Sequence, residues 1–446
     1  MMSLFKRARL GIFLVLCTIF GGTSQNILDY KLILYIASIL IIGWVLTDGT
    51  RKPLSRLNVV PMWILGAFCA IYGLYLIPLP PEIWTSLPGR SIVKEGFDIL
   101  SLPLPYLPAS LTPEMSFLSM LHLLPSLAVL MITLLCGRQA ELKWAFYAVL
   151  GLAVGTIILG LLQLLRGGSD FYIYVYSHFG LAAGFFSNAN HQASFLVMVL
   201  PFAVFMALPT RSTSSLNILF PQQTAIGISL IVLIMVGVVL TGSIAGYMLA
   251  FITFISSAFV MSRGRRINYS MVIACVAVFS GALLFDFLVL GNYTQEFIGE
   301  FEARHGTSRA VMFETSIETG KAYFPFGAGP GSFEAVYQLH EDKAALWRKF
   351  ANNAHNDYIQ LFLEFGILGI VVCAAALGVL ARLFYRYVVR APKKGKLIYG
   401  LCTISLLAVA FHSLADYPLR TPAVSVLAMF LVGVIWRSSG EGPSTH

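Results

Sequence analysis

Long apolar stretches separated by short polar or basic segments dominate this chain. An apolar helix needs roughly 20 residues, at about 1.5 Å per residue, to cross about 30 Å of hydrocarbon. About twelve stretches approach that length: 10–22, 31–47, 59–77, 117–136, 144–164, 194–208, 224–241, 244–260, 270–290, 356–381, 397–413 and 422–436. The pattern predicts an all-α polytopic membrane protein with about 12 transmembrane helices.

Composition agrees with this class. Hydrophobic residues make up 57% of the 446 residues and charged residues only 11%, which excludes an ordinary soluble domain. If the N-terminus is cytoplasmic, most basic residues fall in cytoplasmic segments, as the positive-inside rule requires. These segments contain Lys6 to Arg9, Arg51 to Arg56, Arg263 to Arg266 and Arg386 to Lys396. The net charge of +9 then reflects the orientation of the chain in the membrane. The basic clusters are scattered over short loops, which argues against nucleic-acid binding.

The six cysteines lie in or beside the predicted spans, so neither a disulfide framework nor a metal site is indicated. Residues 6–22 resemble a signal peptide, with a basic start and a short apolar run. The sequence that follows lacks a small-x-small cleavage site, which favours a retained first helix.

The chain divides into an integral membrane domain, 1–436, and a polar cytoplasmic tail, 437–446. Three longer segments, 78–116, 165–193 and 291–355, are predicted on the extracytoplasmic side. Eight prolines in 78–116 favour extended backbone over helix. In 291–355 we expect one helix from Ser308 to Gly320 and a second from Ser332 past Trp347.

His355 stands just before the tenth apolar stretch and is the first candidate for chemistry. An imidazole titrates near neutrality and can take a proton from an attacking hydroxyl. A helix-capping histidine is an equally good interpretation. Glu364 lies on the opposite side of the same helix and about 13 Å further along it, so structural hydrogen bonding is expected there.

Three cations of the large loop are candidates for binding phosphate. Arg309 is preferred, because a guanidinium pairs with phosphate through two hydrogen bonds and keeps its charge. Arg304 and Lys321 are weaker candidates, and for Arg304 a solvated loop charge is the better interpretation.

Polar residues also precede the sixth stretch. Asn188, Asn190 and His191 can bind sugar hydroxyls or a diphosphate at a helix N-terminus, or can simply cap that helix. Gly327, Gly329 and Gly331 lack the Lys-Ser/Thr of a nucleotide loop, so a structural role in a tight turn is expected. A structural, hydrogen-bonding role is also expected for Asp416.

Three motifs together resemble the O-antigen ligase/polymerase superfamily of bacterial membrane glycosyltransferases. They are Gly184-x-Phe-x-Asn-x-Asn-x-x-Ala-x-x-Leu196, Arg309 followed by Pro-x-Gly-x-Gly-x-Gly-x-Phe at 325–333, and His355-Asn-x-Tyr-x-x-x-x-x-Glu-x-Gly366. His412-Ser-Leu-Ala-Asp-Tyr-Pro-Leu is a fourth, less specific motif of the same family.

This resemblance implies an all-helical, GT-C-like bundle with a helical extracytoplasmic loop domain. It implies transfer of glycan from an undecaprenyl diphosphate carrier to an acceptor, without a cofactor or metal. His355 would be the base, Arg309 a diphosphate contact, and Asn356 and Tyr358 substrate contacts. Relatives often carry an arginine where this chain has Ile244. Either Arg304, Lys321 or Arg420 substitutes for it, or the activity differs from that of those relatives.

The resulting prediction is a polymerase of exopolysaccharide or O-antigen repeat units at the periplasmic face of the bacterial inner membrane. Its expected partners are the lipid-linked donor, a glycan acceptor, the bilayer and a chain-length regulator. A ligase acting on lipid A–core of lipopolysaccharide, or on a protein, is the near alternative. An anion transporter is the alternative of another class, but transporters place polar groups near the bilayer midplane, whereas here they gather at the outer interface. We also expect Arg309 and His355 side chains within roughly 10 Å of each other, beside a cavity open to the outer leaflet.

Overall fold

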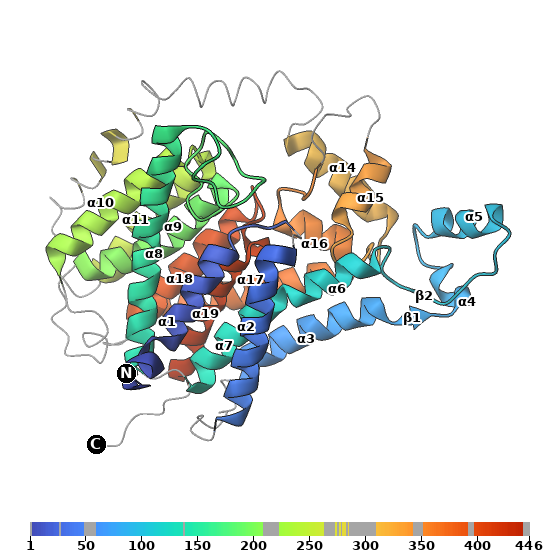
Figure 1. Cartoon of the computed structure of the whole chain (residues 1–446), viewed down its shortest axis with the longest axis horizontal. Helices are drawn as coiled ribbons and strands as arrows, with labels where there is room; N and C mark the ends of the chain where they lie inside the picture. The colour runs from blue at the N-terminus through green and yellow to red at the C-terminus, as the bar shows by residue number, and fades with distance from the viewer. Residues whose placement is uncertain are drawn as a thin grey trace.

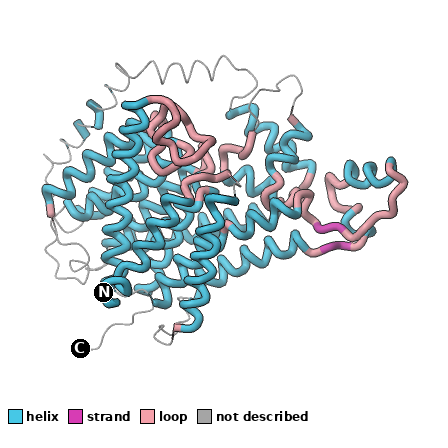
Figure 2. Tube along the Cα trace, viewed as in Figure 1, coloured by secondary structure: helices cyan, strands magenta, loops and turns pink. Residues whose placement is uncertain are grey.

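The computed structural model describes residues 2–25, 28–48, 59–136, 139–207, 223–262, isolated positions between 273 and 284, 309–341, 351–390 and 397–439. Within these ranges the regular structure is almost entirely helical (Figure 2). The exception is a short antiparallel pair, β1 (Pro78–Leu79) with β2 (Leu107–Pro108). The predicted all-α class is confirmed.

The helices follow the predicted stretches closely (Figure 1). Their bounds are α1 Met2–Phe20, α2 Leu28–Thr47, α3 Val59–Leu76, α4 Pro81–Trp84, α5 Ser91–Ile99, α6 Pro113–Leu121, α7 Leu123–Met131, η1 Ile132–Cys136, α8 Gln139–Arg166, α9 Ala189–Ala207, α10 Thr224–Leu240, α11 Ile244–Ser262, α14 Arg309–Ala322, α15 Phe333–His340, α16 Asp357–Phe365, α17 Ile367–Phe384, η4 Tyr385–Val389, α18 Leu397–His412, η5 Pro418–Arg420 and α19 Pro422–Ser439.

Six helices in the described ranges are long and apolar enough to cross a membrane. They are Tyr30–Thr47, Pro113–Cys136, Gln139–Arg166, Ala189–Ala207, Ile244–Ser262 and Ile367–Val389. Shorter apolar helices occupy most of α1, α3, α10, α18 and α19. The predicted stretch 270–290 lies outside the described residues except at isolated positions. The chain is thus a membrane protein with several apolar helices.

Helix α9 lies at the centre of the bundle. All of its residues except Asn190 are buried, as expected for a helix that is apolar on every side. It packs against α8, α10, α11 and α18. Residues at the N-terminal end of α9 are therefore held by several neighbouring helices.

The predicted single span 356–381 is wrong, because the structure has two helices there. Gly366 separates α16 from α17 and has a φ of 55°. A Cβ at this position would lie 2.1 Å from the carbonyl oxygen of Pro325. A glycine is therefore required where the 325–331 loop docks against the chain. Helix α16 packs against α14 and α15, while α17 continues as the apolar helix.

The loops that were predicted to be extracytoplasmic are more helical than expected. Segment 78–116 contains α4, α5 and the start of α6, so the expectation of extended backbone is only partly right. Pro81 and Pro113 each begin a helix, a position where the missing N–H costs nothing. The two expected loop helices appear as α14 and α15. The second is shorter than predicted, because α15 ends at His340 and Glu341 is already extended. Ser308 and residues 342–350 lie outside the described ranges.

Candidate functional site

His355 stands immediately before α16 in a conformation unusual for a non-glycine residue. Its φ is 48°, in the left-handed region where histidine is tolerated better than most residues. The side chain is 24% exposed, and its Nδ1 lies 3.2 Å from Oδ1 of Asp416. Nδ1 of the imidazole is thus held by a buried carboxylate, while part of the ring stays exposed at the surface of the protein.

The start of α16 explains this placement. Asn356 caps the helix, since its Oδ1 accepts from the N–H of Tyr358 and of Ile359 at 3.0 and 3.1 Å. Its Nδ2 donates to the carbonyl of Leu414 at 2.8 Å, and the N–H of Asp357 donates to the carbonyl of Ser413 at 3.0 Å. The first turn of α16 is therefore fastened to the turn after α18, and this brings His355 to Asp416.

Asp416 is only 1% exposed and lies among histidines. Burial alone raises the pKa of its carboxyl, but contact with His355 and the nearby His191 and His412 brings the pKa well below its usual value. Tyr417 places its ring edge-on to His355 and His191, with centroid distances of 4.8 and 4.9 Å. Asp416 is therefore an ionised group in a defined setting.

Two of the neighbouring histidines have structural partners. His191 is fully buried, with Nδ1 2.7 Å from Oγ1 of Thr421 and Nε2 3.9 Å from Oδ1 of Asp416. Nδ1 of His412 lies 2.7 Å from Oγ of Ser194 on α9. Direct binding of substrate by His191 is therefore not supported, because its ring is enclosed and supports Asp416 and Tyr417 instead.

Arg309 is the first residue of α14 and is partly buried. It is near enough to His412 to interact with it electrostatically. Since His412 in turn interacts with Asp416, the N-terminus of α14 approaches the histidine cluster. The distance expected between Arg309 and His355 stays a prediction.

A second charged cluster lies on the other side of the same turn. Nη1 and Nη2 of Arg420 donate to the two carboxylate oxygens of Glu364 at 3.4 and 3.1 Å, and its Nε lies 3.5 Å from Oδ1 of Asp357. Burial raises the pKa of Asp357 to about 6, although Arg420 and a hydrogen bond from Ser413 oppose this. Arg420 is thus committed to two carboxylates, which weakens its candidacy as a substitute for the arginine missing at position 244.

The glycine loop fixes the loop helices against α16. Gly327, Gly329 and Gly331 have φ values of 76°, 106° and 73°. The N–H groups of Ala328 and Gly329 donate to the carbonyls of Leu363 and Glu364 at 3.0 and 2.9 Å. Added Cβ atoms would lie within 2.8 Å of neighbouring backbone or side-chain atoms at all three positions. The loop therefore acts as a close-packed turn, as expected from the sequence.

Several predicted substrate contacts have other roles in the structure. Both polar atoms of the Asn356 side chain form hydrogen bonds to the backbone. The hydroxyl of Tyr358 donates to the carbonyl of Ala410 at 2.7 Å. Lys321 is exposed, is paired with Glu318 at 2.6 Å, and lies at the far end of α14 from Arg309, about 18 Å along a helix of this length. Substrate contact by these three residues stays a prediction. Arg304 lies outside the described residues.

The two asparagines before α9 behave differently from each other. Asn188 is buried and its Oδ1 accepts from the N–H of Asn190 at 2.8 Å, so it caps α9. Asn190 is half-buried and is the one residue of α9 that escapes full burial. Substrate contact therefore remains open for Asn190.

Sequence reasoning missed the pairing of Asp416 with His355 and the ring of Tyr417 between the two histidines. The signal was present in the softer motif 412–419, but no spacing rule connects that motif to residue 355. The described residues contain no group of three or more His, Cys, Asp or Glu side chains arranged to hold a metal ion.

A family model described as O-Antigen ligase matches residues 229–374. The resemblance to the O-antigen ligase/polymerase superfamily is confirmed. The matched segment includes Arg309, the glycine loop and His355, whereas Asp416 lies beyond its end. No curated protein matches the chain. The family supports a membrane enzyme that processes glycans, with a lipid-linked or glycan substrate.

Proposed function

We propose that this protein transfers glycan from an undecaprenyl diphosphate carrier to a glycan acceptor at the periplasmic face of the bacterial inner membrane. The observation that carries the proposal is the contact between His355, within the family-matched segment, and Asp416, beyond its end, 3.2 Å apart. The arrangement would comprise about twelve spans, with α14 to α16 covering the site on the periplasmic side.

The His355–Asp416 pair has the chemistry of a general base. A carboxylate beside Nδ1 favours the proton on that nitrogen, which leaves Nε2 to accept a proton. Nε2 would take the proton of the acceptor hydroxyl while its oxygen bonds to the anomeric carbon of the donor sugar. The bond from that carbon to the diphosphate oxygen breaks, and the carrier diphosphate leaves with the electron pair. The contacts with His355, His191 and His412 outweigh the effect of burial and keep Asp416 ionised throughout.

Arg309 would stabilise the leaving diphosphate. It begins a helix of 14 residues, so the exposed N–H groups and the positive end of the helix dipole favour an anion at the same place. A guanidinium adds paired hydrogen bonds to phosphate oxygens. Ile244 is 54% exposed and supplies no charge, and Arg420 is already paired with Glu364 and Asp357. Arg309 would therefore contribute most of the binding of the diphosphate.

We favour the polymerase over the ligase, for an exopolysaccharide or O-antigen repeat unit. The reason is the uncharged residue at position 244 in a family where an arginine is frequent there. Both reactions use the same donor and the same base, so the acceptor distinguishes them.

Purified protein in proteoliposomes, supplied with lipid-diphosphate-linked repeat units alone, tests this choice. A polymerase produces a ladder of lengthened lipid-linked glycans. Product that appears only after lipid A–core or a protein acceptor is added would identify a ligase. Absence of product with every acceptor, with the protein folded and the donor intact, would contradict glycan transfer.

A further inference from the structure

Residues 78–112 form an arm that projects from the bundle, at the right of Figure 1. The arm contains β1, α4, α5 and β2. Inside it, the indole N–H of Trp84 donates to the carbonyl of Pro105 at 2.9 Å, and the ring of Trp84 lies 6.5 Å from that of Phe97. The arm is therefore internally packed, and α5 has a defined inner side.

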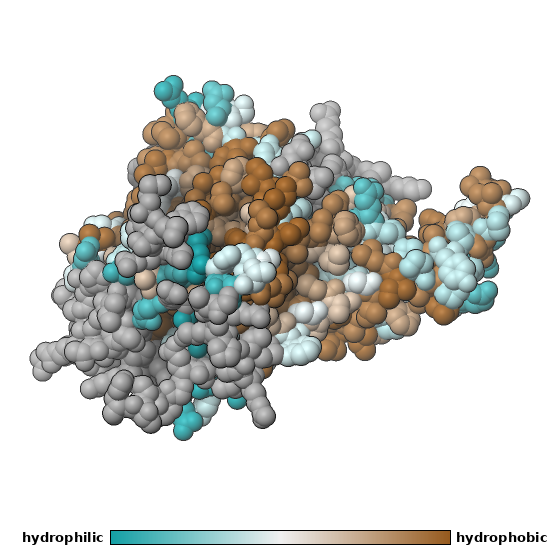
Figure 3. Space-filling view, turned by 60° about the horizontal axis from the view of Figure 1, so that its bottom comes forward, coloured by the Kyte–Doolittle hydropathy of each residue, from teal (hydrophilic) through white to brown (hydrophobic). Residues whose placement is uncertain are grey.

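The outer side of α5 is apolar and exposed. At 100° per residue, the polar residues Ser91, Lys94, Glu95 and Asp98 share one face. Ile92, Ile99 and Leu100 lie on the opposite, exposed side, while Val93 and Phe97 lie between them and the inner side and are partly buried. Ile99 and Leu100 are 82% and 67% exposed, and Ile92 is 53% exposed. The projection in Figure 3 accordingly carries hydrophobic and hydrophilic areas side by side. Such a clean division of faces is typical of a helix that lies in a membrane interface.

The arm is continuous with a lipid-facing helix. Among the described helices, α3 packs mainly against α6 and α7. Its other side is exposed: the exposed fractions along or just after the helix are 72% for Trp63, 57% for Leu74 and 50% for Ile77. Helix α3 runs directly into β1. In Figure 1, α5 lies across the direction of α1, α2 and α8, near the level where α2 begins. Because α2 is long and apolar enough to cross a membrane, its start would mark the boundary of the hydrocarbon layer, near the height of α5.

We propose that α5 is an interfacial membrane helix whose apolar face inserts into the acyl chains of the leaflet on the side of the candidate site. The molecules that contact this apolar face are phospholipids. The polar face, with Lys94, Glu95 and Asp98, stays at the level of the headgroups.

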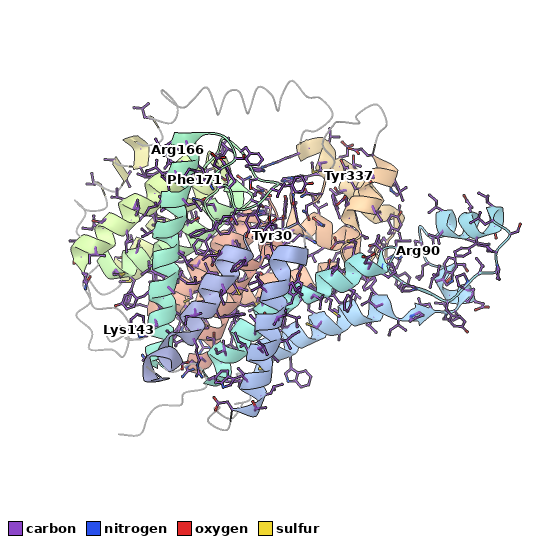
Figure 4. The ribbon with its side chains drawn as sticks, in the orientation of Figure 1. Tyr30, Arg90, Lys143, Arg166, Phe171 and Tyr337 are labelled. Atoms are coloured by element: carbon purple, nitrogen blue, oxygen red, sulfur yellow. The ribbon has the colours of Figure 1, made fainter. Side chains whose placement is uncertain are left out.

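The base of the arm connects α5 to the glycine loop beside the candidate site. Arg90 is buried, and its guanidinium donates to the carbonyls of Pro88, Ala109 and Gly327. It lies 5.7 Å from the ring centroid of Tyr323, and Figure 4 shows it where the arm joins the bundle. Gly327 belongs to the loop that binds the end of α16. Anchoring α5 therefore sets the depth of the loop helices relative to the leaflet.

Spin labels at single cysteines test the proposal in proteoliposomes. Ile99→Cys reports the apolar face and Lys94→Cys the polar face, in a variant whose six native cysteines are replaced. Trp63→Cys on α3 serves as the lipid-facing reference. We expect the Ile99 and Trp63 labels to collide several-fold more with oxygen than with a water-soluble nickel chelate, and the Lys94 label to show the reverse preference.

Equal access of the chelate to Ile99 and Lys94 would overturn the proposal, because α5 would then lie in water. Protection of Ile99 from both reagents would also overturn it and would indicate a protein occupant such as a second copy of the chain. Leu100→Cys repeats the test if Ile99→Cys does not fold. The measurement needs no transfer activity, so it is independent of the proposed function.

Discussion

At the scale of single residues, the proposed mechanism depends on Asp416, which would leave Nε2 of His355 free to accept a proton. The carboxylate lies at Nδ1 and is itself surrounded by His191, Tyr417 and the backbone of its own turn. This is a positioning arrangement, since Asp416 is buried and acts through His355. The positive φ of His355 adds a backbone conformation that the surrounding contacts must maintain.

Replacement of Asp416 by Asn should lower kcat for transfer by about 10- to 1,000-fold with little change in KM for the donor. The imidazolium formed during reaction loses its counter-charge, so the acidic limb of the rate–pH profile should move to lower pH. Asp357→Asn, which removes a carboxylate from the other cluster, is the matched control and should leave that limb in place. An unchanged profile for Asp416→Asn would remove the positioning role.

Replacement of Arg309 by Ala should reduce kcat/KM for the lipid-linked donor by about 10- to 100-fold, the range expected when one charge-assisted pair of hydrogen bonds is lost. Arg309→Lys should recover only part of this, because an ammonium lacks the planar fork. Lys321→Ala, at the other end of α14, should behave like the wild type in the same steady-state assay. Equal effects of Arg309→Ala and Lys321→Ala would contradict diphosphate binding by Arg309.

The sequence indicated which residue types could act, but it did not indicate which of them meet. His355 and Arg309 were selected from their chemistry and their motifs. The pairing of His355 with Asp416 spans more than sixty residues and depends on the Asn356 cap binding Leu414. Full burial of His191 likewise depends on its place in the central helix α9. Tertiary packing decides both, so residue spacing alone could not.

At the scale of elements, the junction between α16 and the turn 413–420 joins the two charged clusters. Asp357 of α16 contacts this turn twice, since Oγ of Ser413 donates to it at 2.8 Å and Nε of Arg420 lies 3.5 Å from it. The break at Gly366 allows α16 to tilt away from the line of α17 and dock there. Apolar length predicted one helix through this region, because hydropathy carries no information about where another loop will dock.

The raised pKa of Asp357 predicts a pH effect on stability. Below pH of about 4 both folded and unfolded carboxyls are protonated, and between about 4 and 6 the folded protein retains a proton that the unfolded chain releases. Asp357 therefore makes the free energy of unfolding fall as pH rises through this window, on the order of 1–3 kcal/mol.

Melting temperatures in detergent at pH 5 and pH 7.5 check this, with Asp357→Asn as the comparison. The wild type should lose more stability between the two pH values than the Asn variant does, because the amide does not titrate. An identical pH dependence of the two proteins would contradict the assignment.

At the scale of the whole molecule, the apolar helices form one bundle and the loop helices α14 to α16 gather at one end of it (Figure 1). The sequence predicted the apolar helices well, because hydrophobic length is a strong signal, but it placed α16 inside a membrane span. The interior position of α9 was not predicted, because the sequence of an apolar helix has the same hydropathy pattern whether lipid or protein surrounds it.

The predicted topology places Lys94 of α5 and the loop 291–355 on the extracytoplasmic side and the basic segment around Arg266 on the cytoplasmic side. Cysteines introduced at Lys94, Lys343 and Arg266 should therefore react with an impermeant maleimide from opposite sides, the first two from outside and the third only after the membrane is opened. Lys343 and Arg266 lie outside the described residues, so labelling is the direct measurement. Modification of all three from the same side would rule out the topology.

Transfer by purified His355→Ala protein is the most direct test of the account. With lipid-diphosphate-linked donor and its acceptor in proteoliposomes, the rate should fall by about 10²- to 10⁴-fold, the usual cost of losing a general base. Folding should be kept, because the side chain is only partly buried and the cap at Asn356 is untouched. Wild-type rates of product formation by a folded His355→Ala protein would contradict the central claim.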